Sequence, residues 1–248
     1  LLRPYPHFQD ITVTFPAGYS YYHSMQVSVE RRMSKGFTIQ SAWTWGKFMD
    51  GAGYLNATDD RPEKVISDQD FTHRFAVSGI YELPFGRGRT WFSTMPKAAD
   101  YVLGGWQLQA WYEGQSGEPL GFGNAIFTGN LADIPLPKNQ RTELRWFNVD
   151  AGFNRNSAQQ LANNIRTFPS LFSGVRADGI NNLNVSAFKV IRLKERLRLE
   201  LSFETFNTFN HVQFGPPNTN PVNAAFGSIT AEKGHGQRQL TTGIKVKF

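Results

Sequence analysis

Seven segments of this chain alternate apolar and polar residues with a period of two, and this pattern constrains the fold more than any other feature. They cover residues 21–32, 37–47, 74–83, 106–114, 182–192, 196–206 and 239–248. Successive side chains of a β-strand point to opposite faces, so each segment is predicted to be a strand with one apolar and one polar face. DITVTF, at residues 10–15, is a weaker eighth candidate. MSKG, at residues 33–36, is predicted to be a tight hairpin turn, with Gly36 available for positive φ.

The length of these segments narrows the fold class. Each has roughly 9 to 13 residues, whereas strands of soluble proteins usually have about 5 or 6. A tilted strand that crosses a bilayer needs about 9 to 11 residues. The alternation alone fits two folds: a soluble β-sandwich, whose apolar face packs on a second sheet, and a transmembrane barrel, whose apolar face contacts lipid and whose polar face lines a wet lumen.

The connections between the segments favour the barrel. If the last segment ends on the periplasmic side, the short turns at 33–36 and 193–195 and the longer segment 84–104 are periplasmic. The extracellular side then receives three long loops, at about residues 48–70, 117–180 and 210–236. Short turns on one side and long loops on the other are typical of outer-membrane barrels.

Aromatic residues at the ends of the apolar faces also favour the barrel. Those near the predicted extracellular ends are Tyr21, Trp45, Phe75 and Tyr112, and those near the periplasmic ends are Phe37, Tyr81, Trp106 and Phe248. Amphipathic rings prefer the bilayer interface, so we expect two aromatic girdles. The core of a sandwich would place aromatics in mid-strand as often as at the ends.

Composition excludes several function classes. The chain has no cysteine, which excludes disulfides, cysteine zinc sites and thiol catalysis. The net charge is +6, but the lysines and arginines are scattered, so no nucleic-acid partner is expected. No run of about 18 apolar residues predicts a transmembrane helix. The start, LLRPYPHFQD, has no secretory-signal pattern, so we expect a processed or partial piece of a longer protein.

Four stretches resemble the C-terminal barrel of TonB-dependent receptors, in the branch that carries an N-terminal carboxypeptidase-regulatory-like domain. They are YYHSMQVSVERRMSKGFTIQSAWTWGKFMD, DFTHRFAVSGIYELPFGRGR, LGGWQLQAWYEGQSGEPL and INNLNVSAFKVIRLKERLRLELSFETFNTFNHVQFGPPN. The resemblance covers nearly the whole chain in the same order. The closing Phe248 resembles the signal that the outer-membrane assembly machinery reads on barrel substrates.

The resemblance implies energised uptake of a bulky nutrient, such as a siderophore, a glycan or a peptide. Receptors of this kind have about 22 strands, an N-terminal plug and a TonB box, of which this chain supplies seven or eight strands. The implied partners are outer-membrane lipids, upstream barrel strands, the plug domain, and the TonB energy-coupling complex through an N-terminal region. An arc of eight strands also leaves two open edges that are costly in lipid. The arc therefore needs upstream strands, a partner or self-closure.

The polar faces supply the candidate ligand contacts. In segment 106–114, Gln107, Gln109 and Glu113 accompany Trp111, whose ring can stack on a sugar or a chelate ring. In segment 196–206, Arg198, Glu200 and Glu204 share one face and are expected to pair with one another along a hydrated wall. Contact with a plug domain explains the same residues equally well.

No catalytic site or cofactor is expected. The chain contains no HExxH, GxSxG, P-loop or GxGxxG pattern, and its five histidines are dispersed. Loop 48–70 is acidic, and Asp59 and Asp60 are weak candidates for Ca²⁺ ligands, although a solvated acidic loop is the simpler interpretation. NSAQQLANNIRTF, at residues 156–168, is predicted to contain a short helix.

Together these observations predict an all-β, antiparallel transmembrane β-barrel of a Gram-negative-type outer membrane. Residues 1–248 form one C-terminal segment of about seven or eight meandering strands from a larger barrel. The first functional hypothesis is a TonB-dependent transporter. The alternatives are a structural outer-membrane barrel or surface-assembly subunit without transport, and a soluble β-sandwich that binds carbohydrate.

Overall fold

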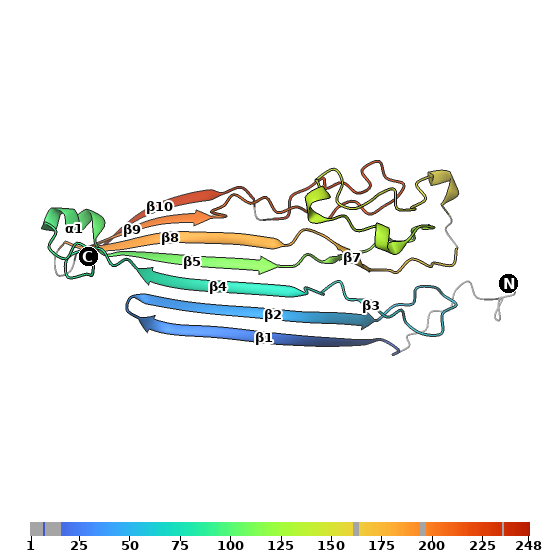
Figure 1. Cartoon of the computed structure of the whole chain (residues 1–248), viewed down its shortest axis with the longest axis horizontal. Coiled ribbons are helices and arrows are strands. Elements are labelled where there is room, and N and C mark those ends of the chain that lie inside the picture. Colours follow the sequence, from blue (N-terminus) through green and yellow to red (C-terminus); the bar gives the residue numbers. More distant parts are fainter. Residues whose placement is uncertain (1–6, 8–15, 161–163, 194–196, 235) are drawn as a thin grey trace.

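The computed structural model describes residues 7, 16–160, 164–193, 197–234 and 236–248, and the predicted strand at 10–15 lies outside these ranges. Within them, the seven long strands form one antiparallel sheet (Figure 1). They are β1 (Tyr19–Ser34), β2 (Phe37–Gly51), β4 (His73–Glu82), β5 (Trp106–Gln115), β8 (Ile180–Arg192), β9 (Arg198–Phe206) and β10 (Gln239–Lys247). Each pairs with the next in that order, so the predicted strands and their meander are confirmed.

Shorter elements lie in the connections. The two-residue strand β3 (Val65–Ile66) pairs with β2, and β6 (Pro119–Leu120) pairs with β7 (Phe172–Arg176) in a separate small sheet. Helix α1 (Lys97–Leu103) precedes β5. Three 3₁₀ turns cover Leu131–Asp133, Lys138–Gln140 and Ser157–Gln159.

The helix predicted within residues 156–168 is limited to a single 3₁₀ turn, Ser157–Gln159. The Asn156 side chain caps this turn by accepting a 3.0 Å hydrogen bond from the backbone N–H of Ala158. Residues 164–168 follow without helical structure, and 161–163 lie outside the described residues. The predicted short helix is thus present only as this 3₁₀ turn in the described part of the segment, where the polar residues form local side-chain-to-backbone bonds.

The turn between β1 and β2, together with a β-bulge, sets their register. Lys35 and Gly36 both have positive φ, of 52° and 77°, as a two-residue hairpin of the primed type requires. A side chain on Gly36 would place its Cβ 3.2 Å from that of Glu82 on the neighbouring strand. A β-bulge between Arg31 and Ser34 shifts the pairing by one residue beyond this turn, and the two features together place Val27 opposite Trp43 and Met25 opposite Trp45.

The register gives the sheet one apolar and one polar face. Val27 faces Trp43 and Trp43 faces Phe75, and the pairing through β5 and β8 places Leu201 and Ile244 on the same face, nearer the end where β1 and β2 are joined. No second sheet covers this face within the described residues, and Val27 and Ile244 keep 44% and 76% of their surface exposed. The β-sandwich alternative is therefore wrong, since its apolar face would be buried.

The buried core lies in the long loops instead. Phe122 packs against Phe147, Phe153 and Phe168 at ring-centroid distances of 5.1, 5.1 and 5.3 Å. Phe226, from the loop between β9 and β10, completes the cluster. We call this group the phenylalanine core. It makes the loops a folded layer at one end of the sheet.

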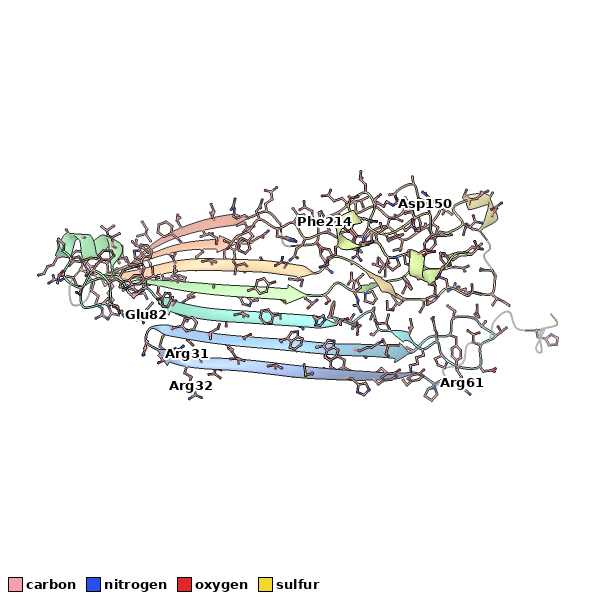
Figure 2. All side chains as sticks on the ribbon, in the orientation of Figure 1. Arg31, Arg32, Arg61, Glu82, Asp150 and Phe214 are labelled. Atoms are coloured by element: carbon pink, nitrogen blue, oxygen red, sulfur yellow. The ribbon has the colours of Figure 1, made fainter. Side chains whose placement is uncertain are left out.

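The two ends of the sheet differ as predicted. Figure 2 shows Arg31, Arg32 and Glu82 at the end with the short turns, and Asp150, Phe214 and Arg61 at the end with the long loops. Helix α1 lies beside the short-turn end in Figure 1. The described residues contain no helix that is both long and apolar enough to span a membrane.

Candidate functional site

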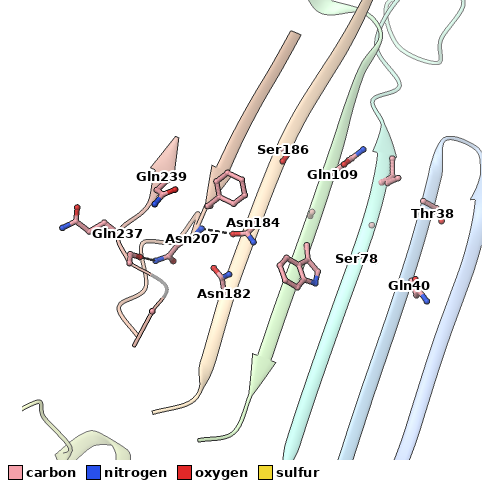
Figure 3. A pocket seen from close by; sticks show the side chains of 17 residues that line it. Thr38, Gln40, Ser78, Gln109, Asn182, Asn184, Ser186, Asn207, Gln237 and Gln239 are labelled. Atoms are coloured by element: carbon pink, nitrogen blue, oxygen red, sulfur yellow. Dashed lines mark hydrogen bonds between the residues drawn. The ribbon is translucent and has the colours of Figure 1, made fainter. Parts of the chain in front are cut away.

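The polar face of the sheet carries a hollow of about 790 Å³. Strands β2, β4, β5, β8, β9 and β10 contribute residues to it, and Asn207, Gly234, Gly236 and Gln237 from the loop between β9 and β10 lie along one side (Figure 3). The non-glycine residues that line it are Thr38, Gln40, Ser78, Ile80, Gln109, Ala110, Trp111, Asn182, Asn184, Ser186, Phe206, Asn207, Gln237 and Gln239. We call this hollow the amide hollow, because amide side chains predominate.

The amide hollow has an uncharged lining with one orphaned acceptor. No Asp, Glu, Lys or Arg is among the described residues that line it. Asn182 is 6% exposed, and its Oδ1 has no hydrogen-bond partner within the described structure. A buried acceptor without a partner is costly. It is therefore suited to receive a hydroxyl or amide from a molecule that enters the hollow.

Asn207 organises one side of the amide hollow. Its backbone N–H donates to Asn184 Oδ1 at 2.9 Å, and its Nδ2 donates to the carbonyls of His211 and Gly236 at 2.9 and 3.0 Å. A positive φ of 50° at Asn207 allows the chain to turn there directly after β9. These bonds hold the loop that follows β9 against the polar face.

The structure brings together only part of the predicted ligand-contact set. Gln109 and Trp111 line the amide hollow, with Trp111 opposite Ser78 and Asn184. Gln107 and Glu113 lie on the same face of β5, towards its two ends, and do not line the hollow.

The predicted pairing on β9 was wrong. Glu200 accepts a 2.6 Å hydrogen bond from Lys247 on β10 and does not bond Arg198. Antiparallel pairing places the β10 lysines beside Glu200, whereas Arg198 is two residues along the same strand. Glu204 lies opposite Ser186 and Thr241 on the polar face. Arg198, Glu200 and Glu204 all lie outside the hollow.

A buried ion pair joins two of the long loops beyond the loop end of the sheet. Asp70, which is 1% exposed, accepts from Arg176 Nη2 at 2.6 Å and from the backbone N–H of Phe48, also at 2.6 Å. Arg176 also donates to the carbonyls of Asp70 and Gly117 at 2.7 and 3.0 Å. The first long loop is thereby joined to the second.

Further bonds join all three loops into one layer. Asn56 exchanges two hydrogen bonds with the backbone of Arg166, at 3.1 and 2.6 Å. The backbone N–H of Ile229 donates to Glu143 O at 2.7 Å, which connects the second loop to the third. With the phenylalanine core, these contacts make the loop layer a single folded unit.

Seven of the eight predicted girdle residues lie on the apolar face of the strands, and the eighth, Phe248, follows the last residue of β10 and is fully exposed. Phe37 packs edge-on against Tyr81 at 6.1 Å, and Phe75 lies 6.0 Å from Tyr112. At the loop end, Lys64 Nζ lies 5.2 Å from the Tyr21 ring centroid. A hydrogen bond with the Tyr21 hydroxyl raises the pKa of Lys64 above its ordinary value. A location of these rings at the bilayer interface stays a prediction.

The described residues of the acidic loop do not form a metal-binding site. Within the described ranges, no three His, Cys, Asp or Glu side chains lie together so as to hold a metal ion. The Asp59 carboxylate accepts a 2.7 Å hydrogen bond from the backbone N–H of Asn56 and thus stabilises a turn. Asp60 is exposed.

Comparisons with known proteins agree with this geometry at the level of the fold. A family model described as an outer membrane beta barrel domain matches residues 1–241. Searches of curated proteins and of solved structures gave no match.

Proposed function

Because the chain belongs to the family of outer membrane beta barrel domains, we propose that it forms the C-terminal wall of a TonB-dependent transporter for a bulky nutrient. Membership of this family places the protein in the outer membrane, with the apolar face towards lipid and the polar face towards the lumen. The observation that carries the proposal is the uncharged amide hollow, which is lumenal and includes Trp111. The resemblance of four stretches to TonB-dependent receptors supports it.

Among the three nutrient classes, the amide hollow favours a glycan. Amide side chains both donate and accept hydrogen bonds, as sugar hydroxyls do, and the exposed Trp111 ring offers an apolar surface for a sugar ring. A strongly charged siderophore or peptide would leave its charge without a partner on this lining, which is unfavourable.

The same proposal assigns partners to the remaining surfaces. Strands β1 and β10 end the sheet without a further partner strand within the described residues. Backbone groups exposed to lipid are costly, so upstream barrel strands are proposed to pair with these edges. A plug domain is proposed to contact the lumenal face beside the hollow, and the TonB complex is proposed to act through an N-terminal region.

An uptake experiment tests the proposal. Cells with and without the gene would receive a labelled panel containing a ferric siderophore, a neutral oligosaccharide and a peptide. We expect the deletion to abolish accumulation of the oligosaccharide, and a protonophore to abolish it in the parent cells, because TonB coupling uses the proton gradient. Equal accumulation of all three compounds in both strains would overturn the transport proposal.

The folded loop layer favours a second candidate, a structural barrel that presents a surface for assembly. A pore does not require folded loops, whereas the phenylalanine core gives the proposed extracellular surface a fixed shape. This candidate predicts normal uptake in the deletion strain but loss of a complex from the cell surface. Co-purification after cross-linking of intact cells measures that loss.

A further inference from the structure

A lysine interrupts the apolar face of the wall. Lys189 on β8 lies between Ala187 and Ile191 on the lipid-facing side, opposite Trp106 and Leu201. A charge on this side of a barrel is unfavourable unless its ammonium reaches polar groups. Lys189 is nevertheless only 4% exposed. Something other than water must therefore satisfy its ammonium.

Helix α1 satisfies it. Lys189 Nζ donates to the carbonyl oxygens of Asp100, Val102 and Gly104, at the C-terminal end of the helix. A cation is favourable at this end because the last carbonyls of a helix lack intrahelical partners. Trp106 adds a 2.9 Å hydrogen bond from its Nε1 to Val102 O, and its ring centroid lies 5.5 Å from Lys189 Nζ. Helix α1 is thus fixed on the lipid-facing side of the wall.

The approach to α1 is also specifically built. Asp100 Oδ1 accepts a 2.8 Å hydrogen bond from the backbone N–H of Arg87. Gly86 has a φ of 124°, and a Cβ there would lie 2.7 Å from Asp100 Oδ1. Residues 84–104 therefore have a defined shape at the periplasmic end. We call them the rim segment.

The rim segment displays apolar side chains outwards. Its large exposed residues are Trp91, Phe92, Tyr101, Val102 and Leu103, with 53% to 66% of their surface exposed. The segment also carries the exposed basic residues Arg87, Arg89 and Lys97, and Arg89 pairs with Glu82 at 3.0 Å. Apolar and basic side chains together are typical of elements that lie in a membrane interface.

We propose that the rim segment is a membrane-interface anchor that inserts into the periplasmic leaflet of the outer membrane, with Lys189 as the residue that positions α1. The occupant of its apolar surface is phospholipid, because that surface continues the lipid-facing side of the wall through Lys189 and Trp106. Arg87 and Lys97 suit the phosphate groups of the same leaflet. This anchoring function is separate from nutrient uptake.

Depth-dependent quenching tests the anchor. The 248 residues contain no cysteine, so Val102→Cys introduces a unique labelling site in this chain. The full protein, labelled there with an environment-sensitive fluorophore, would be reconstituted in phosphatidylethanolamine–phosphatidylglycerol vesicles that contain spin-labelled lipid. Val27→Cys on the lipid-facing side and Thr58→Cys in an extracellular loop are the membrane and water controls.

We expect strong quenching at Val102 by lipid that is spin-labelled near the headgroup, and little quenching by aqueous iodide. A label at Val102 that behaves like the one at Thr58 would overturn the anchor. So would a label that is shielded from both quenchers, because a protein partner would then cover the segment. Absence of lipid quenching at Val27 would contradict the membrane location of the wall itself.

A second pair of variants tests the positioning role. In the Val102→Cys background, Lys189→Met should lower lipid quenching towards the Thr58 value. The carbonyls of α1 would lose the hydrogen bonds from the Lys189 ammonium, and the helix would no longer be held on the lipid-facing side. Lys245→Met, on the polar face of β10, should leave quenching unchanged. Unchanged quenching in Lys189→Met would remove Lys189 from the proposal.

Discussion

Two aromatic side chains on the polar face, Trp111 and Tyr22, differ in their position relative to the amide hollow. Trp111 on β5 lines the hollow. Tyr22 on β1 also lies on the polar face of the sheet, but it packs over Gly46 and does not line the hollow. Both rings are exposed and amphipathic. Only the first is placed where a sugar can meet both an aromatic face and several amides.

Replacement of Trp111 by alanine should weaken binding of the proposed glycan ligand by about tenfold, equivalent to about 1.4 kcal/mol, as is common for a central aromatic contact. Titration of the purified protein with the oligosaccharide identified by uptake measures the change. Tyr22→Ala is the matched control and should bind normally. An equal loss in both variants would mean that the hollow has no special role.

Asp70 joins the first long loop to the second through its ion pair with Arg176. In Asp70→Asn, the Arg176 guanidinium would lose its ionic partner in a largely buried position, at a cost of about 3 to 5 kcal/mol. We expect faster cleavage of the loops by a protease added to intact cells. Asp68→Asn, an exposed change in the same loop, should leave the cleavage rate unchanged. Unaltered resistance in Asp70→Asn would show that the ion pair does not hold the loops.

At the scale of elements, the strands and the loops follow different rules. Each strand is stable only when its two faces meet two different environments, which for this wall are lipid and the lumen. The loops instead bury their own apolar residues, as a soluble domain does. A change should therefore disturb one or the other, according to the element in which it lies.

Two neighbouring substitutions in β1 test the faces of the wall. Val27→Arg places a charge towards lipid and should cost about 2 to 4 kcal/mol near the bilayer midplane. Gln26→Arg adds the same charge on the lumenal side and should cost little. Urea unfolding in lipid vesicles measures both. Equal destabilisation would contradict the assignment of the two faces.

The phenylalanine core should be separable from the wall. Phe153→Ala removes a buried ring, which commonly costs about 3 to 5 kcal/mol, and should make the loops sensitive to external protease. The wall should keep its heat-modifiable migration in gels, because no strand is altered. Phe209→Ala, a change at an exposed loop residue, is the control. Loss of the folded wall in Phe153→Ala would show that loops and wall form one cooperative unit.

The elements that could be predicted from the sequence are those with a periodic pattern of apolar residues. All seven long strands were predictable, because a period of two assigns every residue of a strand to a face. The phenylalanine core was not, since Phe122 and Phe226 lie in different loops without a period. In the hollow, Gln109 and Trp111 were predictable as polar-face residues of one strand. Asn184 joined them only through the register of β5 with β8, and Asn207 only through a loop.

Lys189 shows what the same approach missed. It breaks the alternation of segment 182–192 on the apolar side, and that break was the available signal. The contact of Lys189 with the backbone carbonyls of α1 was not predictable, because it joins two distant segments and has no local sequence pattern.

At the scale of the whole molecule, the open sheet is the feature with the widest consequence. The outer edges of β1 and β10 are unpaired within the described residues, and lipid cannot replace the missing hydrogen bonds. In the outer membrane, both edges should therefore be paired with further strands. The wall is then one sector of a larger closed structure.

Hydrogen exchange in native outer-membrane preparations tests this closure. The amides of β10 that do not bond β9 should exchange as slowly as those in the middle of the sheet, because neighbouring strands protect them. Amides of the exposed loop residue Thr58 provide the fast reference. Fast exchange along the outer edge of β10 would mean that no strand covers it.

The second and third long loops share the phenylalanine core, and hydrogen bonds join the first loop to them, so all three loops contribute to the surface of one folded layer. Residues from distant parts of the chain, such as Asn56 and Arg166, lie side by side only while the loops are folded. Antibodies or phages that recognise this protein on living cells would therefore read a discontinuous epitope, and short synthetic peptides copied from single loops would be poor immunogens against it.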